Sequence, residues 1–359
     1  MNAKRKKLIY NLSTYAVVVI AFFWCQALVA SGGMTRSLKG QLVPICCWIT
    51  MAVSLNLVVG ISGELSLGHA GFMSIGAFTG IIISGWLQHG MGMADTTLRL
   101  VIAIAAGGLL AGITGVLIGI PVLRLRGDYL AIVTLAFGEI IRNVMNCVYV
   151  SVDGKALNID FLNPNLPGKL LLNGPNGAVS VAKISTFTAG FILVLAALFI
   201  VLNLTNSRSG RAIMAIRDAR IAAESVGINA TKYKMMAFVI SAVLAGMAGA
   251  LYGLNFSTLV AGKFKFDQSI NVLVFVVLGG IGNTLGAVIA AAALTILPEL
   301  LRAFADYRML VYAIVLILVM LATNNPFIKQ LTGNLVNKLK GLFRGRKLPD
   351  ASVKGGDRA

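Results

Sequence analysis

Long runs of apolar residues dominate the chain, and short polar segments separate them. Three of these runs, residues 42–59, 100–122 and 187–204, contain no charged side chain. A helix needs roughly 20 apolar residues to cross the hydrocarbon core of a bilayer, and only helices and closed barrels satisfy their backbone hydrogen bonds in lipid. Because the runs lack the strict alternation of barrel strands, the pattern predicts an all-α, polytopic membrane protein.

The pattern predicts about ten membrane helices, some of them broken or re-entrant. They cover residues 8–30, 42–60, 65–87, 100–123, 129–150, 184–205, 235–258, 269–282, 284–301 and 309–323. The polar segments between them indicate the orientation, because Lys and Arg accumulate on the cytoplasmic side. With the amino terminus in the cytoplasm, the inside segments hold twenty basic residues and the outside segments ten. Both termini are therefore expected in the cytoplasm, with an even number of crossings.

This parity constrains residues 269–301, which must cross twice or enter the membrane and return. The centre of the stretch, from Gly279 to Gly286, is rich in glycine. Glycine permits the tight reversal that a broken or re-entrant helix needs.

Composition agrees with a membrane location and accounts for the positive charge. Charged residues make up 12% of the chain, against about 25% in a typical soluble domain. The net charge of +18 would suggest nucleic acid in a soluble protein, but here it follows from orientation, and no nucleic-acid motif accompanies it. The four cysteines lie in apolar runs without metal-ligand spacing or a disulfide framework, so they are expected to be small buried hydrophobes.

Three parts of the chain are expected. Residues 1–41 form an N-terminal helix and outside loop, residues 42–323 a transmembrane domain, and residues 324–359 a basic cytoplasmic tail that is partly disordered. The first helix begins like a signal peptide, but its apolar run is longer than usual, which favours an uncleaved helix. Residues 151–183 form the longest outside loop, and residues 331–343 fit an amphipathic helix on the anionic leaflet.

Residues 206–234 form the most informative predicted cytoplasmic loop. One amphipathic helix is expected between Ser209, as N-cap, and Gly227, as the left-handed helix end. Its apolar face comprises Ile213, Ile216, Ala219, Ala223 and Val226, and Arg220 can pair with Glu224 on the other face. Two interpretations fit this pattern. The helix is an ordinary connector, or it is a coupling helix that docks its apolar face into a partner protein.

Four segments, in the same order, resemble one family of membrane proteins. They are residues 64–72, residues 123–139, residues 211–227 with Ala222-Ala223-x-x-x-Gly227, and residues 277–286. From about residue 42 to 321 the chain resembles the permease subunits of branched-chain amino-acid ABC importers, specifically the larger of two paralogous membrane subunits. It departs from the family pattern at Ile221, where Glu often precedes the two alanines, and at residues 173–177 and 324–326.

The resemblance implies a multi-pass subunit of a bacterial cytoplasmic membrane with several partners. These are a paralogous permease subunit, two cytoplasmic ATP-binding subunits and an extracytoplasmic substrate-binding protein. The chain itself would be no enzyme, would have no catalytic residue, and would bind neither cofactor nor metal. It has no phosphate-binding loop, so the partner subunits would use the ATP. Coupling to the ATPase is then assigned to Arg211, Arg217, Asp218, Ala222, Ala223, Glu224 and Gly227.

Polar residues within the membrane are candidates for the translocation path. The residues expected to line this path are Glu64, Ser66, Gly68, His69, Gly279, Gly280, Gly282 and Asn283. The break that contains Glu64 and His69 is expected to line it near the cytoplasmic side of the membrane. In the alternative, Glu64 lies in interfacial water and His69 bonds a backbone carbonyl. Elsewhere, Glu139 and Arg142 are three apart and are expected to form a structural ion pair. Gly107, Gly108, Gly246 and Gly249 permit close helix packing.

Two other functions remain open at the level of sequence. An ion-coupled secondary transporter would need intramembrane acids and broken helices, for which Glu64 and the stretch from Gly279 to Gly286 are candidates. Within the importer interpretation, urea or short amides are alternatives to leucine, isoleucine and valine. An intramembrane enzyme is disfavoured, because the sequence shows no paired catalytic acids, no metal-ligand cluster and no nucleophile-base set. It contains only two histidines.

Overall fold

The computed structural model describes residues 3–125, 127–161, 163, 166–179, 181–301, 307, 310–311, 313–314 and 316–317. In this part of the chain, seven helices are long and apolar enough to cross a membrane, and two shorter apolar helices follow them. The prediction of a polytopic helical membrane protein is confirmed. The predicted span 309–323 lies largely outside the described residues, and the basic tail lies wholly outside them.

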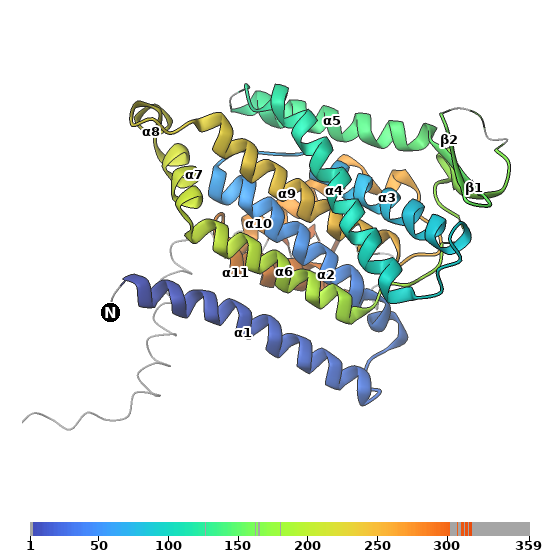
Figure 1. Cartoon of the computed structure of the whole chain (residues 1–359). Coiled ribbons are helices and arrows are strands. Elements are labelled where there is room, and N and C mark those ends of the chain that lie inside the picture. The colour runs from blue at the N-terminus through green and yellow to red at the C-terminus, as the bar shows by residue number, and fades with distance from the viewer. Residues whose placement is uncertain are drawn as a thin grey trace, which may run out of the picture. The chain divides into compact units, whose positions relative to one another are not determined.

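Helices form most of the described chain (Figure 1). In order they are α1 (Ala3–Ala30), α2 (Arg36–Asn56) continued by the π-helical segment η1 (Leu57–Ser62), α3 (His69–His89), α4 (Thr96–Val122), α5 (Asp128–Cys147), α6 (Phe187–Asn206), α7 (Arg208–Asp218), α8 (Arg220–Ser225), α9 (Ala230–Gly253), α10 (Phe266–Gly279) and α11 (Thr284–Leu300). Two 3₁₀ turns, η2 (Gly174–Asn176) and η3 (Ala261–Phe264), lie in the connections.

Helices α3, α4 and α9 pack closely because glycines line their contacts. A side chain at Gly76 of α3 would collide with the backbone of Gly246 in α9, and one at Gly246 would collide with Gly107 of α4. A side chain at Gly249 would likewise meet the Met73 backbone. Small residues let membrane helices approach to backbone contact, so the predicted role of these glycines is confirmed.

The remaining helices surround this core. Helix α2 packs against α6, α9, α10 and α11, and α1 rests on α6 through the ring of Phe22, which stacks on Phe187 and Phe191. One face of α4 stays exposed, with Leu109 at 64%, Ile113 at 52% and Leu117 at 65%. Apolar side chains at this spacing form the lipid-facing stripe of a membrane helix.

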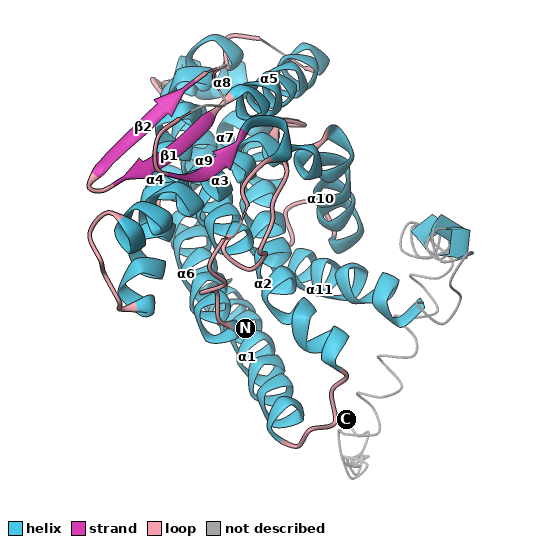
Figure 2. Ribbon diagram, turned by 90° about the vertical axis from the view of Figure 1, so that its right-hand side faces the viewer, coloured by secondary structure: helices cyan, strands magenta, loops and turns pink. Residues whose placement is uncertain are grey.

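A small antiparallel sheet replaces part of the outside loop expected at residues 151–183. It has the order β2-β1-β3, formed by β1 (Tyr149–Asp153), β2 (Ala156–Asp160) and β3 (Lys169–Asn173). Figure 2 shows the three strands side by side, and Figure 1 shows them at the opposite end of the helices from α7 and α8. The expected span 129–150 is too long, since α5 ends at Cys147 and β1 begins at Tyr149.

A second boundary also differs from the prediction. The span expected from residue 65 begins at His69, because residues 63–68 are not helical and Gly63 takes a left-handed φ of +76°. This non-helical stretch, between η1 and α3, lies at the centre of the candidate site.

Candidate functional site

The 206–234 segment contains two short helices where one was expected. Helices α7 and α8 are separated at Ala219, whose φ of −152° and ψ of 85° are not helical. The N-cap is Ser207, whose hydroxyl accepts a hydrogen bond from the Gly210 N–H at 3.1 Å. The assignment of Ser209 as cap is therefore wrong, because α7 starts almost directly after α6. The left-handed helix end is confirmed, since Gly227 has a φ of +85°.

Most of the apolar face expected to dock on a partner is buried within this chain. Ile213 is 1% exposed, Ile216 is 2% exposed and Ala223 is 5% exposed. Ile216 and Ala223 form one apolar cluster with Ala230, the first residue of α9. The prediction that Ile213, Ile216 and Ala223 are available to a partner protein is therefore wrong. These side chains instead pack α7 and α8 against the rest of the chain.

A different surface of α8 is exposed. Ile221 is 85% exposed and Val226 is 75% exposed, and Ala222 is also exposed. Arg220 and Glu224 form the predicted ion pair at 2.9 Å. Exposed apolar side chains with polar surroundings are typical of a protein-binding surface. Ile221 and Ala222 of α8, with Val226 as an exposed part of the predicted face, are therefore open to a partner.

Arg217 extends from α7 toward the membrane helices. Its Nη1 donates a hydrogen bond to the Gly60 carbonyl oxygen in η1 at 2.9 Å, and its side chain also lies against Gly63. It forms an ion pair with the neighbouring Asp218 at 2.9 Å. The last carbonyls of a helix lack helical partners and carry partial negative charge, so the guanidinium stabilises the end of η1. Arg211 differs, since it donates to the Asn206 carbonyl of its own loop at 3.3 Å.

The non-helical stretch after η1 is held from three sides. Glu64 forms an ion pair with Lys234 of α9, and both side chains are 12% exposed. The Leu67 N–H donates to the Thr134 hydroxyl of α5 at 3.0 Å, and Gly68 lies directly against the Thr134 backbone. Glu64 is therefore a paired acid at a helix junction.

The turn between α10 and α11 contacts η1 and the end of α2. Gly280 and Gly282 have φ values of +91° and +83°, and the Asn283 side chain caps α11 by accepting from the Gly286 N–H at 3.1 Å. The predicted reversal at these glycines is confirmed. The Gly282 N–H donates to the Asn56 side-chain oxygen of α2 at 2.9 Å, and Gly60 packs directly on Gly282.

Helices α10 and α11 are both short for membrane crossings. They contain 14 and 17 residues, which at about 1.5 Å per residue is less than the roughly 30 Å of a hydrocarbon core. Their lengths fit the re-entrant alternative of the prediction.

His69 lies in a buried polar cluster between α2, α3 and α9. It is 1% exposed, and its Nε2 lies 2.8 Å from the Ser54 hydroxyl and 3.3 Å from the Ser241 hydroxyl. The carbonyl partner expected for His69 is therefore replaced by two serines. Asn56, Ser66 and Ser74 each have a buried side-chain polar atom without a protein partner. These three atoms remain able to form further hydrogen bonds.

The predicted pair of Glu139 and Arg142 is confirmed, with 2.7 Å between Glu139 Oε2 and Arg142 Nε. The other oxygen of Glu139 accepts a hydrogen bond from the Phe266 N–H, the first residue of α10, at 3.3 Å. This pair therefore also ties α5 to α10.

Comparison with known proteins identifies the family. The family described as branched-chain amino acid transport system / permease component matches residues 38–320. The chain belongs to this permease family. It is accordingly a transport subunit rather than an enzyme.

Individual relatives support the assignment. The permease is 33% identical over 345 residues to the high-affinity branched-chain amino acid transport system permease protein LivM of Salmonella typhimurium, covering 87% of this chain and 73% of the relative. It is 34% identical over 308 residues to LivM of Escherichia coli K12, covering 76% and 66%. It is also 27% identical over 285 residues to LivH of that strain, covering 76% and 87%. No solved structure matches the permease.

The structure places the site residues predicted in the permease in three groups. The Gly279–Asn283 turn meets η1 at Gly60, and Arg217 reaches Gly60 from α7. Glu64, Ser66, Gly68 and His69 lie beyond the end of η1, where Glu64 contacts α9, Gly68 contacts α5, and His69 contacts α2 and α9. Ala222 and Glu224 form a third group on the exposed surface of α8, and Gly227 is exposed just after that helix. Sequence reasoning did not find Asn56, Gly60, Lys234 or the serine partners of His69, because each contributes through a contact with a distant segment.

Proposed function

We propose that the permease pairs with a paralogous membrane subunit to form the path for branched-chain amino acids in an ATP-driven importer. Its similarity to both LivM and LivH relatives, whose names describe branched-chain amino acid transport permeases, supports a pair of related subunits. Two cytoplasmic ATP-binding subunits and an extracytoplasmic binding protein complete the proposed importer. The chain would bind no cofactor, and ATP would be used by the partner subunits.

The proposed location is the bacterial inner membrane, with both termini in the cytoplasm. The distribution of Lys and Arg supports this orientation, with twenty basic residues inside and ten outside. In this orientation α7 and α8 face the ATPases, and the β-sheet lies on the opposite, extracytoplasmic side.

The observation that carries the proposal is the hydrogen bond from Arg217 to Gly60. Ile221 of α8 and Val226 directly after it are exposed to a partner, and α7 is attached to η1 by Arg217. η1 in turn contacts the α10–α11 turn at Gly282. π-helical segments often occur at functional sites. A force applied to α8 by an ATPase would thus reach two broken membrane elements through direct contacts.

Purification from the native host in mild detergent tests the assembly. Mass spectrometry is expected to find a paralogous permease and ATP-binding subunits with the tagged chain. The complex, reconstituted in liposomes with its binding protein, is expected to accumulate leucine only with ATP, and isoleucine and valine should compete. Competition by urea or acetamide instead would reassign the substrate. Leucine uptake by the chain alone, driven by an ion gradient, would contradict the importer.

A further inference from the structure

At the end of the helices opposite α7 and α8, a buried arginine has no counter-ion among the described residues. Arg99, in the first turn of α4, is 5% exposed. Its Nη2 donates to the neutral oxygens of Gln88 at 3.0 Å and Ser84 at 3.4 Å, and its Nε has no partner. None of the ion pairs among the described residues includes Arg99. Because a buried, unpaired charge is costly, an anion beside Arg99 would stabilise this arrangement.

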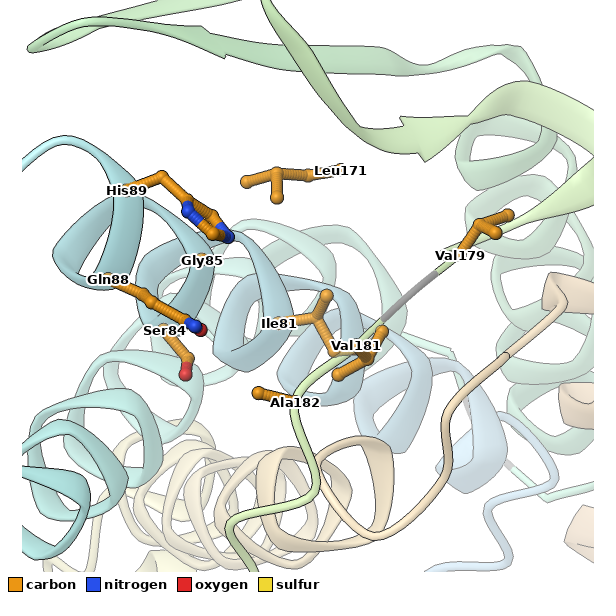
Figure 3. Close-up of a pocket in the computed structure, with 9 residues that line it drawn as sticks. All are labelled: Ile81, Ser84, Gly85, Gln88, His89, Leu171, Val179, Val181 and Ala182. Carbon is orange, nitrogen blue, oxygen red and sulfur yellow. The ribbon is translucent and has the colours of Figure 1, made fainter.

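A small cavity lies directly beside these neutral partners. Ser84, Gln88 and His89 of α3 line one side of it (Figure 3), and Leu171 of β3 lies across from them. Its volume is about 20 Å³, which is space for little more than one water-sized group. The cavity can therefore admit the tip of a side chain, but not a whole branched-chain amino acid.

The electrostatic surroundings of the cavity are positive. Lys169 of β3 donates a hydrogen bond to His89 Nε2 at 3.0 Å, and, like Arg99, it takes part in no ion pair among the described residues. The nearest acid in sequence, Asp95, lines a separate hollow with Thr96 and Thr97. Arg99 and Lys169 therefore each contact residues that line the cavity, and neither forms an ion pair with a carboxylate among the described residues.

The neighbouring sheet adds an exposed apolar surface. Leu157, Ile159 and Phe161 alternate along and just beyond the edge strand β2 and are 38%, 55% and 56% exposed. The Trp86 indole N–H of α3 donates to the Lys155 carbonyl at 3.0 Å, which fastens the β1–β2 turn to the helix that lines the cavity. Apolar contacts around a desolvated Arg are typical of protein interfaces.

We propose that the cavity lined by Ser84, Gln88, His89 and Leu171 receives an Asp or Glu side chain of the extracytoplasmic binding protein, next to the Arg99 guanidinium that donates hydrogen bonds to Ser84 and Gln88. The carboxylate would replace the neutral oxygen of Gln88 and accept charge-assisted hydrogen bonds from Arg99 and Lys169. The strand β2 would supply the adjoining apolar contact. This inference rests on the importer and the orientation proposed above.

The test compares Arg99→Gln with Arg99→Lys and with Lys39→Gln, an exposed residue of the same proposed side. The reconstituted complex is immobilised in nanodiscs, and the Kd for its purified leucine-binding protein is measured at two salt concentrations. Arg99→Gln is expected to raise the Kd at least about tenfold and to weaken its salt dependence, whereas Lys39→Gln leaves the Kd within about twofold. Arg99→Lys should recover part of the affinity.

A second measurement separates this inference from the importer itself. The purified chain is heated in acetate or chloride at matched ionic strength, with acetate as the minimal carboxylate. Acetate should raise the unfolding temperature of the wild type but not of Arg99→Gln, and this variant should be no less stable in chloride because it removes an unpaired charge.

The outcomes are distinct. In one outcome, acetate protects the chain while the complex has no affinity for a binding protein. That result would overturn the proposed importer and the proposed docking partner, and would support only a carboxylate-binding site at Arg99. Equal affinity of wild type and Arg99→Gln for the binding protein would overturn the docking site and leave the importer intact. Loss of the Arg99 effect when anionic lipids are omitted would assign the cavity to lipid phosphate and overturn the proposal.

Discussion

The Arg217 guanidinium lies 2.9 Å from the carbonyl oxygen of Gly60, a residue 157 positions earlier in the chain. This hydrogen bond joins α7, outside the bundle of long helices, to the π-helical end of α2 within it. The same η1 segment packs on the α10–α11 turn at Gly282. Arg217 thus acts on a membrane helix of its own chain, although the sequence suggested a residue that faces the ATPase.

Arg217→Gln is expected to separate ATP hydrolysis from transport, because the neutral amide is too short to hold η1. In the reconstituted complex, the amount of leucine transported per ATP hydrolysed should fall at least about fivefold. A change of about fivefold corresponds to the lower end of typical coupling free energies between two sites. Arg208→Gln is the matched control, since Arg208 lies on the same helix and is exposed. Arg217→Lys should restore part of the coupling. An unchanged ratio in Arg217→Gln, with the complex intact, would show that η1 is not positioned by this residue.

Gly60→Ala is expected to force η1 away from the α10–α11 turn. A Cβ at this position would collide with the Gly282 backbone and with the Asn56 side chain. Overpacking of this kind costs about 1–3 kcal/mol, so the unfolding temperature of the purified chain should fall. Gly40→Ala, where a Cβ meets nothing within 4 Å, should leave it unchanged or slightly higher. A stable Gly60→Ala variant would mean that η1 and the turn separate without cost.

Ala223→Asp and Ile221→Asp should have different effects, although the two residues are close in sequence. Ala223 is 5% exposed and Ile221 is 85% exposed. Ala223→Asp buries a carboxylate in an apolar cluster, which costs roughly 2 kcal/mol or more and should lower thermal stability. Ile221→Asp should leave stability unchanged but reduce the ATP-binding subunits that co-purify. Full recovery of those subunits with Ile221→Asp would place the docking surface elsewhere.

Glu64→Gln tests whether the acid serves mainly as the partner of Lys234. If so, the variant should lose about 1–3 kcal/mol of stability because Lys234 keeps its charge without a counter-ion. Lys234→Met in the same chain should recover much of this loss, which a double-mutant cycle would measure as a coupling energy of about 1 kcal/mol or more. Leucine transport by the doubly substituted complex should persist. Loss of transport in a stable double variant would instead indicate a charged role for Glu64 in the path.

The sequence by itself determined the class of the protein and the position of most helices. Apolar runs predict membrane helices because lipid permits few alternatives for the backbone, and the structure confirms helices at nine of the ten predicted positions within its described residues. Local chemistry was also sufficient for the Gly279–Gly286 reversal, the left-handed Gly227 and the pairs Glu139–Arg142 and Arg220–Glu224. Each of these depends on residues a few positions apart.

Only the tertiary structure decided which sides of those helices are free and what their polar groups contact. The α7–α8 face has the periodicity of a docking helix, but the same periodicity fits a helix that packs on its own chain, and burial of Ile216 and Ala223 against Ala230 distinguishes the two. Arg217 with Gly60, Glu64 with Lys234, and Gln88 with Arg99 likewise depend on how the chain folds back on itself. Spacing along a sequence specifies the neighbours within one helix, whereas contacts between helices are set by packing in three dimensions.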